Sequence, residues 1–278
     1  MEGQLSKVQM FMQENPASGE YVSAALQGEA VDSRVLVDDH LVPMIASVFR
    51  RIRAEVRPDS LTAEQALLFI QELSVFARYN SQFLHRAATS VEHVCFELAH
   101  ELRRNHLEEG GERGKIPAHY TLYSRALMLD LGVMVNGRVP FPETHVLLTL
   151  HDLLVTSHSA STICGGYFAT EGVAIDETEL LKEITDRFAD LTSGRSGAGL
   201  PNLDYYYSLH LDDSHEAAAG QGLSVEASHM DGIARFVREA DLFNLDTAQT
   251  CDGFLQIMEG MAYWWTELAA RSSGIVRS

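Results

Sequence analysis

Apolar side chains recur at every third or fourth position along most of this chain, the spacing that places them on one face of an α-helix. Alternating runs of Val, Ile and Thr bounded by hairpin dipeptides, which would indicate strands, are scarce. One long helical stripe consists of Leu67, Phe69, Ile70, Leu73, Phe76, Ala77, Phe83 and Leu84. The pattern therefore predicts an all-α fold in which helices pack as a bundle.

Local start and stop signals divide this pattern into segments. Ser60 or Thr62 can cap a helix N-terminus, whereas Gly110-Gly111 and Gly132 are typical of helix ends. Pro43 is expected to begin or kink the helix that contains it. We expect helices over residues 35–53, 62–85, 91–109, 118–131, 142–174 continuing through 175–191, one or two within 205–238, and 247–270, with a flexible loop over 192–202.

The chain is expected to form a single domain, since no internal repeat or low-complexity tract interrupts the helical pattern. Residues 1–57 are expected to supply a peripheral helical arm and a first helix packed on the bundle, and residues 58–278 the bundle itself. Small residues are concentrated in SHSASTICGGYFATEG, within the predicted helix 142–174. Such residues let a second helix or a cofactor approach closely.

Composition narrows the classes of function. The 278 residues include 21 Lys and Arg against 39 Asp and Glu, a formal net charge of −18, and 46% are hydrophobic. The hydrophobic share excludes a disordered chain, and the acidity argues against nucleic acid or an anionic membrane as a partner. Cys95, Cys164 and Cys251 fit neither a disulfide framework nor a thiolate zinc site. Without a secretion signal or an apolar run of bilayer length, we expect a soluble, cytoplasmic protein.

The 12 histidines raise the question of a metal site, but a lone histidine on a helix is usually a surface or core residue. We give that structural interpretation to His40, His85, His93, His106 and His145. His151 and His158 are seven residues apart and share a helix face, with no carboxylate at a matched spacing. They are expected in the core or around a site rather than on a metal.

Two carboxylates stand out by their position. Glu109 follows Glu108 at the end of one predicted helix and His119 begins the next, so the short loop between them could bring Glu109 and His119 to one ion. A solvated acidic helix end is the alternative interpretation. Glu171 lies among apolar and small residues, where an unpaired buried charge costs on the order of several kcal/mol unless a cation or a hydrogen-bond network compensates it.

A third group follows a run of tyrosines, in the segment YYYSLHLDDSHE. Asp212 and His215 are three residues apart, as are His210 and Asp213, so each pair shares a face of a regular helix. His210 and His215 can reach one site only through a local distortion such as a π-bulge.

Farther along the chain, Glu226 and His229 have the same three-residue offset, but no histidine lies four positions upstream, and the pair ranks second. Together these groups offer carboxylates and imidazoles without a thiolate. That donor set suits non-haem iron or manganese in a helical bundle better than structural zinc. No HExxH motif indicates a hydrolytic zinc site.

The same residues carry a resemblance to a known family. The segments SLTAEQALLFIQELSVFARYNSQFLHRAA, ELRRNHLEEGGE and PAHYTLYSRALMLDLGV resemble the core of haem-oxygenase-like diiron oxidases and oxygenases, which share their helical bundle with the TenA and PqqC proteins. In that family a Glu closes one helix and a His opens the next, a pattern similar to Glu109 and His119 followed by Tyr123 and Leu131-Gly132. A second Glu on the next long core helix corresponds to Glu171. The resemblance covers roughly residues 58–270.

The last metal-binding helix of that family carries His-x3-Asp-x2-His after a run of aromatic residues. Here three tyrosines at 205–207 precede His210, and Asp212-x2-His215 keeps the second half of the motif. His210 lies two residues closer to His215 than the family spacing, and Asp213 competes with Asp212.

The resemblance implies a haem-oxygenase-like bundle that forms a homodimer, holds two Fe(II) ions per chain or a mixed Mn/Fe pair, and uses O2 as co-substrate. It implies an oxidase or oxygenase acting on a small nitrogen-containing or amino-acid-derived metabolite. The metal ligands it implies are Glu109, His119, Glu171, His210, Asp212 and His215. Arg78, Tyr79 and the tyrosine run are candidates for holding the substrate.

Two other classes of function fit the same bundle. One is a metal-independent TenA- or PqqC-like enzyme with Cys164 as nucleophile, although a buried structural thiol is the commoner role for such a residue. The other is a non-catalytic helical interaction protein whose histidines are structural. The aromatic last helix, with Trp264 and Trp265, is a weak sign of an interface.

Overall fold

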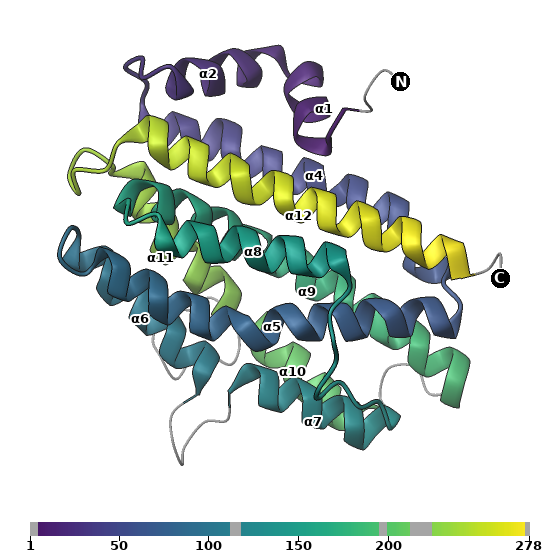
Figure 1. The fold of residues 1–278 in the computed structure, drawn as a ribbon. Coiled ribbons are helices and arrows are strands. Elements are labelled where there is room, and N and C mark those ends of the chain that lie inside the picture. The colour runs from purple at the N-terminus through teal and green to yellow at the C-terminus, as the bar shows by residue number, and fades with distance from the viewer. Residues whose placement is uncertain (1–4, 112–117, 195–198, 212–223, 276–278) are drawn as a thin grey trace.

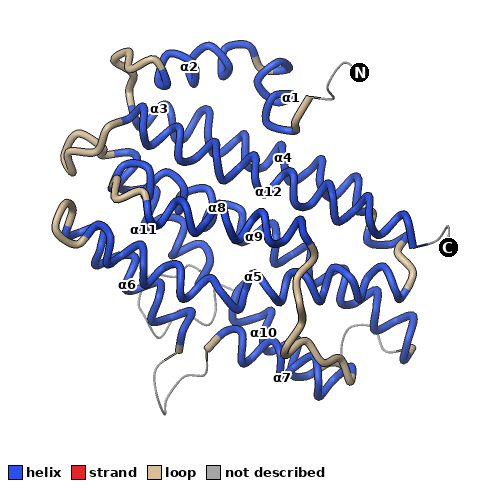
Figure 2. The backbone as a smooth tube through the Cα atoms, viewed as in Figure 1, coloured by secondary structure: helices blue, strands red, loops and turns tan. Residues whose placement is uncertain are grey.

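The computed structural model describes residues 5–111, 118–194, 199–211 and 224–275, and within these ranges the chain is helical and contains no strand (Figure 2). This confirms the predicted all-α, single-domain fold. None of the described helices is both long and apolar enough to cross a membrane. The elements are α1 (Lys7–Glu14), α2 (Pro16–Leu26), α3 (Ser33–Val35), η1 (Leu36–Leu41), α4 (Val42–Val56), η2 (Pro58–Ser60), α5 (Ala63–Val91), α6 (Phe96–Gly110), α7 (His119–Leu131), α8 (Pro142–Thr156), α9 (Ala160–Ser193), α10 (Pro201–Leu211), α11 (Val225–Arg238) and α12 (Thr247–Ile275).

Two long helices, α9 and α12, pack along each other at the centre of the bundle (Figure 1). Helices α1 and α2 lie along one edge, against α4 and α12, and α7 and α10 lie at the opposite edge. Helix α5 packs against α6, α8 and α9. Helices α6, α7, α10 and α11 contact one another and, with α9, enclose the candidate site described below.

The start of α5 follows from its local sequence. The Thr62 hydroxyl accepts a hydrogen bond from the Gln65 N–H at 3.3 Å, and the Gln65 side-chain oxygen accepts one from the Thr62 N–H at 2.9 Å. This reciprocal capping box satisfies two backbone donors and confirms the predicted start. The helix continues to Val91 rather than ending at His85, because its buried face extends that far.

A wide turn precedes the helix that contains Pro43. In η1 the N–H of Val42 donates to the carbonyl of Val37, five residues earlier. Helix α4 then begins with Pro43 in its first turn, a position that proline favours. Pro43 therefore marks the start of a helix, one of the two roles predicted for it.

The predicted helix over residues 142–174 is in fact two helices. Helix α8 ends at Thr156 and α9 begins at Ala160. Between them His158 has a φ of 57°, in the left-handed region that ends a helix. The Ser159 hydroxyl caps α9 by accepting a hydrogen bond from the Thr162 N–H at 3.2 Å. The polar small residues of this segment thus form a turn, and α9 runs unbroken from there to Ser193.

Glycines allow α9 and α12 to approach closely. A Cβ added to Gly165 would lie 1.8 Å from the Thr250 carbonyl oxygen, and one added to Gly253 would lie 2.2 Å from the Thr162 carbonyl oxygen. The small-residue stretch of α9 therefore lets a second helix pack closely against it. This is one of the two partners, a helix or a cofactor, that its composition predicts.

The two tryptophans of α12 belong to the core. Trp264 and Trp265 are both fully buried, and Trp265 stacks on Phe69 with ring centroids 5.7 Å apart. The two tryptophans therefore contribute no surface to an interface.

Gly165→Ala is expected to lower the free energy of unfolding by about 1–3 kcal/mol, because the added methyl group meets the Thr250 carbonyl. Urea denaturation of wild type and variant measures the change. Gly274→Ala on the same helix pair is the matched control, since no atom lies within 4 Å of the added Cβ, and it is expected to be neutral or stabilising. Equal stabilities for the two variants would contradict the tight packing of α9 and α12.

Candidate metal centre

Five helices bring three carboxylates and three imidazoles together in the interior. We call this set the Glu/His cluster; it consists of Glu109 on α6, His119 on α7, Glu171 on α9, His210 on α10, and Glu226 and His229 on α11. Five of the six are buried, and Glu109 keeps only 12% of its side chain exposed. Such a concentration of ionisable groups away from water requires compensation within the cluster.

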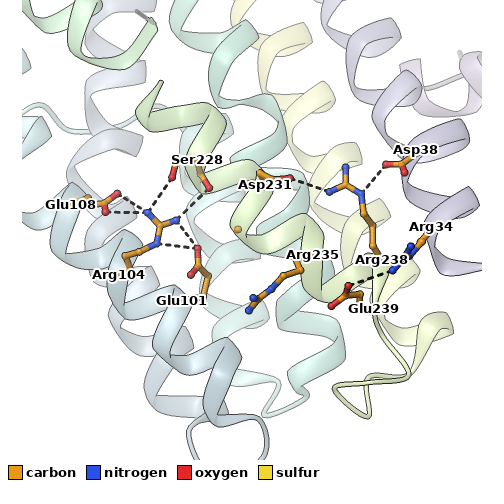
Figure 3. Close-up of a pocket in the computed structure, with 11 residues that line it drawn as sticks. Arg34, Asp38, Glu101, Arg104, Glu108, Ser228, Asp231, Arg235, Arg238 and Glu239 are labelled. Carbon is orange, nitrogen blue, oxygen red and sulfur yellow. Dashed lines mark hydrogen bonds and ion pairs between the residues drawn. The ribbon is translucent and has the colours of Figure 1, made fainter. Parts of the chain in front are cut away.

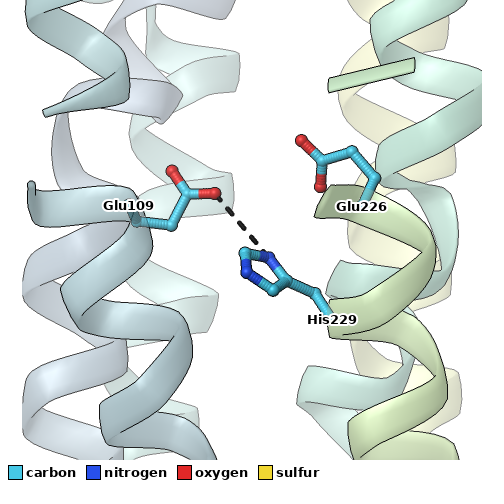
Figure 4. Close-up of side chains that lie close together, drawn as sticks. All are labelled: Glu109, Glu226 and His229. Atoms are coloured by element: carbon cyan, nitrogen blue, oxygen red, sulfur yellow. Dashed lines mark ion pairs between the residues drawn. The ribbon is translucent and has the colours of Figure 1, made fainter. Parts of the chain in front are cut away.

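The donor atoms converge within the reach of a metal ion. His229 Nδ1 lies 3.5 Å from Glu171 Oε2 and 4.0 Å from Glu109 Oε1. One donor atom from each of Glu109, Glu226 and His229 lies within 4.8 Å of the others. Figure 4 shows Glu109 on one side and both α11 residues facing it from the other. Glu226 and His229 are three residues apart, so they share the inward face of α11.

The other two imidazoles complete the cluster. His119 Nδ1 lies 3.3 Å from Glu109 Oε2 and 3.2 Å from His210 Nε2. His210 Nδ1 donates to the Tyr206 carbonyl at 2.6 Å, and since a carbonyl only accepts, the ring proton resides on Nδ1. His210 Nε2 is therefore left with a lone pair, 3.9 Å from Glu226 Oε1.

An outer carboxylate orients His229. His229 Nε2 donates to Glu108 Oε2 at 2.6 Å, so Nδ1 is the ring nitrogen that faces Glu109 and Glu171. Burial alone would lower the pKa of His229, but the neighbouring Glu108 and Glu171 raise it, so in the metal-free protein Nδ1 carries a proton that a metal ion would displace. The Arg104 guanidinium donates to both oxygens of Glu108, at 3.1 and 3.2 Å. The chain of contacts Arg104–Glu108–His229 thus leads from the surface to the centre of the cluster.

Arg104 is itself held at the edge of a charged surface groove of about 680 Å³ (Figure 3). It donates to Glu101 at 2.6 Å and to the Ser228 carbonyl at 3.3 Å. A side chain at Gly232 would collide with Glu101, since an added Cβ lies 1.9 Å from Oε1. The absence of a side chain on α11 at this point leaves room for Glu101 to hold Arg104.

Two polar atoms of the cluster have no hydrogen-bond partner although they are buried. They are Glu171 Oε1 and His229 Nδ1. Leaving a buried donor or acceptor unpaired costs about 1–3 kcal/mol, and more when the group is charged. A cation bound between these atoms would give each of them a partner. The residues present therefore fit a bound metal.

The pKa values within the cluster diverge because its groups share a dry space. Burial and the neighbouring Glu109 raise the pKa of Glu226 to about 8. Burial alone would also raise the pKa of Glu109, but His119, His229 and His210 together lower it to about 2. Burial and the adjacent His119 lower the pKa of His210 to about 4. The cluster therefore combines an ionised carboxylate, a protonated one and a neutral imidazole.

The structure brings together four of the six ligands predicted from the sequence: Glu109, His119, Glu171 and His210. The other two, Asp212 and His215, lie outside the described residues, as does Asp213. Glu226 and His229, the pair ranked second, lie in the cluster. The sequence indicated this pair by its three-residue offset. The pair ranked second because the group that contains His210 follows the run of tyrosines.

A small cavity of about 80 Å³ adjoins the cluster between α5, α7, α9 and α10. Its lining includes Asn80 and Glu177, which sequence reasoning missed. It does not include Arg78 or Tyr79, the predicted substrate-holding residues next to Asn80 on α5. Adjacent residues on a helix face different directions, so Arg78 and Tyr79 point away from the cavity wall that Asn80 forms, whereas Tyr206 of the tyrosine run does line the cavity.

Two other residues considered from sequence are structural. The Cys164 thiol is fully buried, does not line the cavity, and has a pKa raised by burial, so it lacks the exposure and thiolate character of a nucleophile. His151 packs against Phe76 and Phe83 and bonds the Leu147 carbonyl at 3.0 Å, as expected for a core histidine.

Known proteins share this architecture. A family model described as a domain of unknown function with a solved structure, DUF3865, matches residues 55–271. Two crystal structures of a CADD-like protein of unknown function from Nostoc punctiforme are similar to the chain, with TM-scores of 0.63 and 0.65 and 21% sequence identity. Each similarity covers 92% of this chain, and 96% and 99% of the respective neighbour. No curated protein matches the chain.

The CADD-like neighbours have the helical haem-oxygenase-like fold. The likeness extends over nearly the whole of both chains, so this chain has the same fold. The fold predicted from the family resemblance is thereby confirmed.

In the metal-free protein, Glu226→Gln is expected to change how stability depends on pH. Because the folded pKa of Glu226, about 8, lies above its ordinary value of 4.5, the wild type loses stability as the pH rises between these values. The loss is on the order of a few kcal/mol, and glutamine cannot ionise and so avoids it. Urea denaturation in the presence of chelator at pH 5 and pH 8 tests this; parallel pH dependence in both proteins would contradict it.

Proposed function

We propose that this chain, which belongs to the DUF3865 family of domains of unknown function, is a non-haem diiron oxidase or oxygenase that acts on a small nitrogen-containing metabolite. One observation carries the proposal: a buried Glu/His cluster in which Glu171 Oε1 and His229 Nδ1 lack hydrogen-bond partners. Two divalent cations would supply the positive charge and the bonds that these atoms lack.

The composition of the cluster favours iron or manganese. Carboxylate oxygens and imidazole nitrogens without a thiolate are the donors these metals take, and Glu226-x-x-His229 is the spacing used in the bundle-core sites of di-iron carboxylate proteins. The residues that would hold the ions are Glu109, His119, Glu171, His210, Glu226 and His229. When bound, the iron pair would supply the electrons that activate O2.

The chain itself contributes orientation. One ring N–H of His210 donates a hydrogen bond to the Tyr206 carbonyl, and one ring N–H of His229 donates to Glu108. Both acceptors lie outside the cluster. Each ring is thereby oriented so that its other nitrogen faces inward before any ion arrives. Five rigid helices hold these side chains, and their burial excludes bulk water from the centre of the cluster.

The adjoining cavity supports a small substrate. It contacts the cluster through Glu109, Glu171, His210 and other cluster residues, and apolar side chains such as Leu73 and Phe76 line the remainder. A molecule bound there would lie directly against the ions. The fully buried Cys164 gives no comparable support to a thiol-based reaction.

Wild-type protein loaded with Fe(II) in the absence of oxygen is expected to bind about two irons per chain and then to consume O2. Glu171→Ala and His229→Ala are expected to lose iron, because each removes a buried donor. Elemental analysis and an oxygen electrode provide the two readouts. The exposed Glu179→Ala and His145→Ala are matched controls and should load as wild type does. Full iron content in both cluster variants would refute the proposal.

The same assay decides which residues complete the ligand set. If Glu226 and His229 do so, Asp212→Ala and His215→Ala retain both irons and Glu226→Ala does not. The reverse pattern would return that role to Asp212 and His215.

Glu108→Ala is expected to weaken metal binding by about 10- to 100-fold, because His229 loses the acceptor that fixes its tautomer. Competition with a coloured chelator measures the affinity. Asp231→Asn is the control, since Asp231 lines the same groove but contacts Arg238 instead. Equal affinities for the two variants would show that Glu108 has no positioning role.

A further inference from the structure

Two fully buried polar side chains outside the Glu/His cluster have no hydrogen-bond partner within the described part of the chain. Asn105 on α6 leaves both its amide nitrogen and its amide oxygen unpaired, and Tyr167 on α9 leaves its hydroxyl unpaired. Neither residue lines the cavity beside the cluster. Unpaired buried groups cost free energy that Leu or Phe of similar shape would avoid. Their presence indicates a partner that the metal-free protein does not supply.

Each of these residues lies one helical turn before a carboxylate of the cluster. Asn105 precedes Glu109 by four positions on α6. Tyr167 precedes Glu171 by four positions on α9. Residues four apart share a helix face, and the Cα–Cβ bonds of a helix tilt toward its N-terminus, so both carboxylates lean toward these groups. Burial and the nearby Glu171 raise the pKa of the Tyr167 hydroxyl, which therefore stays protonated as a donor.

The two residues lie on the same side of the cluster, because α6 and α9 run in the same direction. Helix α6 packs back along α5 after the short turn over residues 92–95, so these two helices are antiparallel. Helix α9 is also antiparallel to α5. Near its end Arg187 donates to the Leu61 carbonyl just before α5 begins, whereas Glu171 shares a cavity with Asn80, deep within α5. The cavity extends along α9 in the other direction, toward its C-terminus.

A metal ion in the cluster would change the partners of its carboxylates. In the metal-free protein His119 Nδ1 lies 3.3 Å from Glu109 Oε2. His229 Nδ1 likewise lies 3.5 Å from Glu171 Oε2. An imidazole nitrogen that binds a metal has given up its proton, so it no longer donates to a carboxylate. Ligating carboxylates are normally held by hydrogen bonds of their own, and the unused donors one turn away can provide them.

We propose that Asn105 and Tyr167 are positioning residues, each of which donates a hydrogen bond to the cluster carboxylate one turn later when a divalent cation is bound. The inference rests on the proposed function only in placing a metal at the Glu/His cluster. Outer hydrogen bonds of this kind restrict the orientation of a ligand and raise metal affinity. The same two side chains therefore destabilise the metal-free protein, where they are unpaired, and stabilise the metal-loaded one.

Asn105→Leu and Tyr167→Phe separate these two effects, since each removes the polar atoms and nearly keeps the shape. With chelator present, urea denaturation is expected to give an unfolding midpoint equal to or higher than that of wild type. Affinity for redox-inert Zn(II), measured by competition with a coloured chelator, is expected to fall about 10- to 100-fold in each variant. Tyr263→Phe, which changes an exposed tyrosine on α12, is the control and should alter neither quantity.

A purely structural role for these residues predicts the opposite result, a lower urea midpoint without chelator-resolved loss of affinity. That result, or wild-type affinity for Zn(II) in both variants, would overturn the proposal, as would a wild-type protein that binds no Zn(II). A spectroscopic measurement adds a readout that packing alone would not move. At saturating Co(II), whose visible absorption reports coordination geometry, Tyr167→Phe is expected to shift the spectrum and Tyr263→Phe to leave it unchanged.

The positioning role and the diiron function fail separately. Weakened Zn(II) binding in both variants of a protein that consumes no O2 when loaded with iron would leave the positioning role and remove the diiron function. Two bound irons and O2 consumption in the wild type, with full metal affinity in both variants, would do the opposite.

Discussion

Three carboxylates buried at one place are the constraint on which the rest of this structure depends. Moving an ionised carboxylate out of water is costly, and neighbouring like charges add to the cost. The chain meets it with His119 beside Glu109, His229 beside Glu171, and a pKa for Glu226 high enough to keep its proton near neutral pH. Two atoms, Glu171 Oε1 and His229 Nδ1, still have no hydrogen-bond partner within the protein. A bundle that needed only stability would bury apolar side chains there instead.

The surrounding helices give these groups fixed positions. Helix α9 carries both Glu171 and Glu177, and glycine contacts with α12 hold it against the core without intervening side chains. Two polar features of one cavity therefore sit on a single rigid element, at a separation set by helix rise. The Arg104–Glu108–His229 chain performs a similar task from the opposite side, tying the orientation of an interior ring to charges at the surface.

The large acid excess of the chain divides into groups with different physical roles. Many carboxylates lie at the surface, where pairs such as Arg86 with Asp152 are solvated and worth little. Glu108 is half-exposed and acts on the interior through a histidine. Glu226 and Glu177 are among the few whose pKa is raised by burial, and both line the cavity.

The sequence alone determined the features that depend on neighbours within a turn or two of helix. Thr62 and Gln65 capped α5 as expected, the apolar spacing defined the bundle, and an acidic residue within small and apolar neighbours marked Glu171 as buried. Only tertiary structure decided that α11 brings Glu226 and His229 to Glu109, and that Glu177 shares a cavity with Asn80. These depend on how helices far apart in sequence pack together. Residue spacing specifies which side chains share one helix face, but the packing of whole helices decides which faces meet.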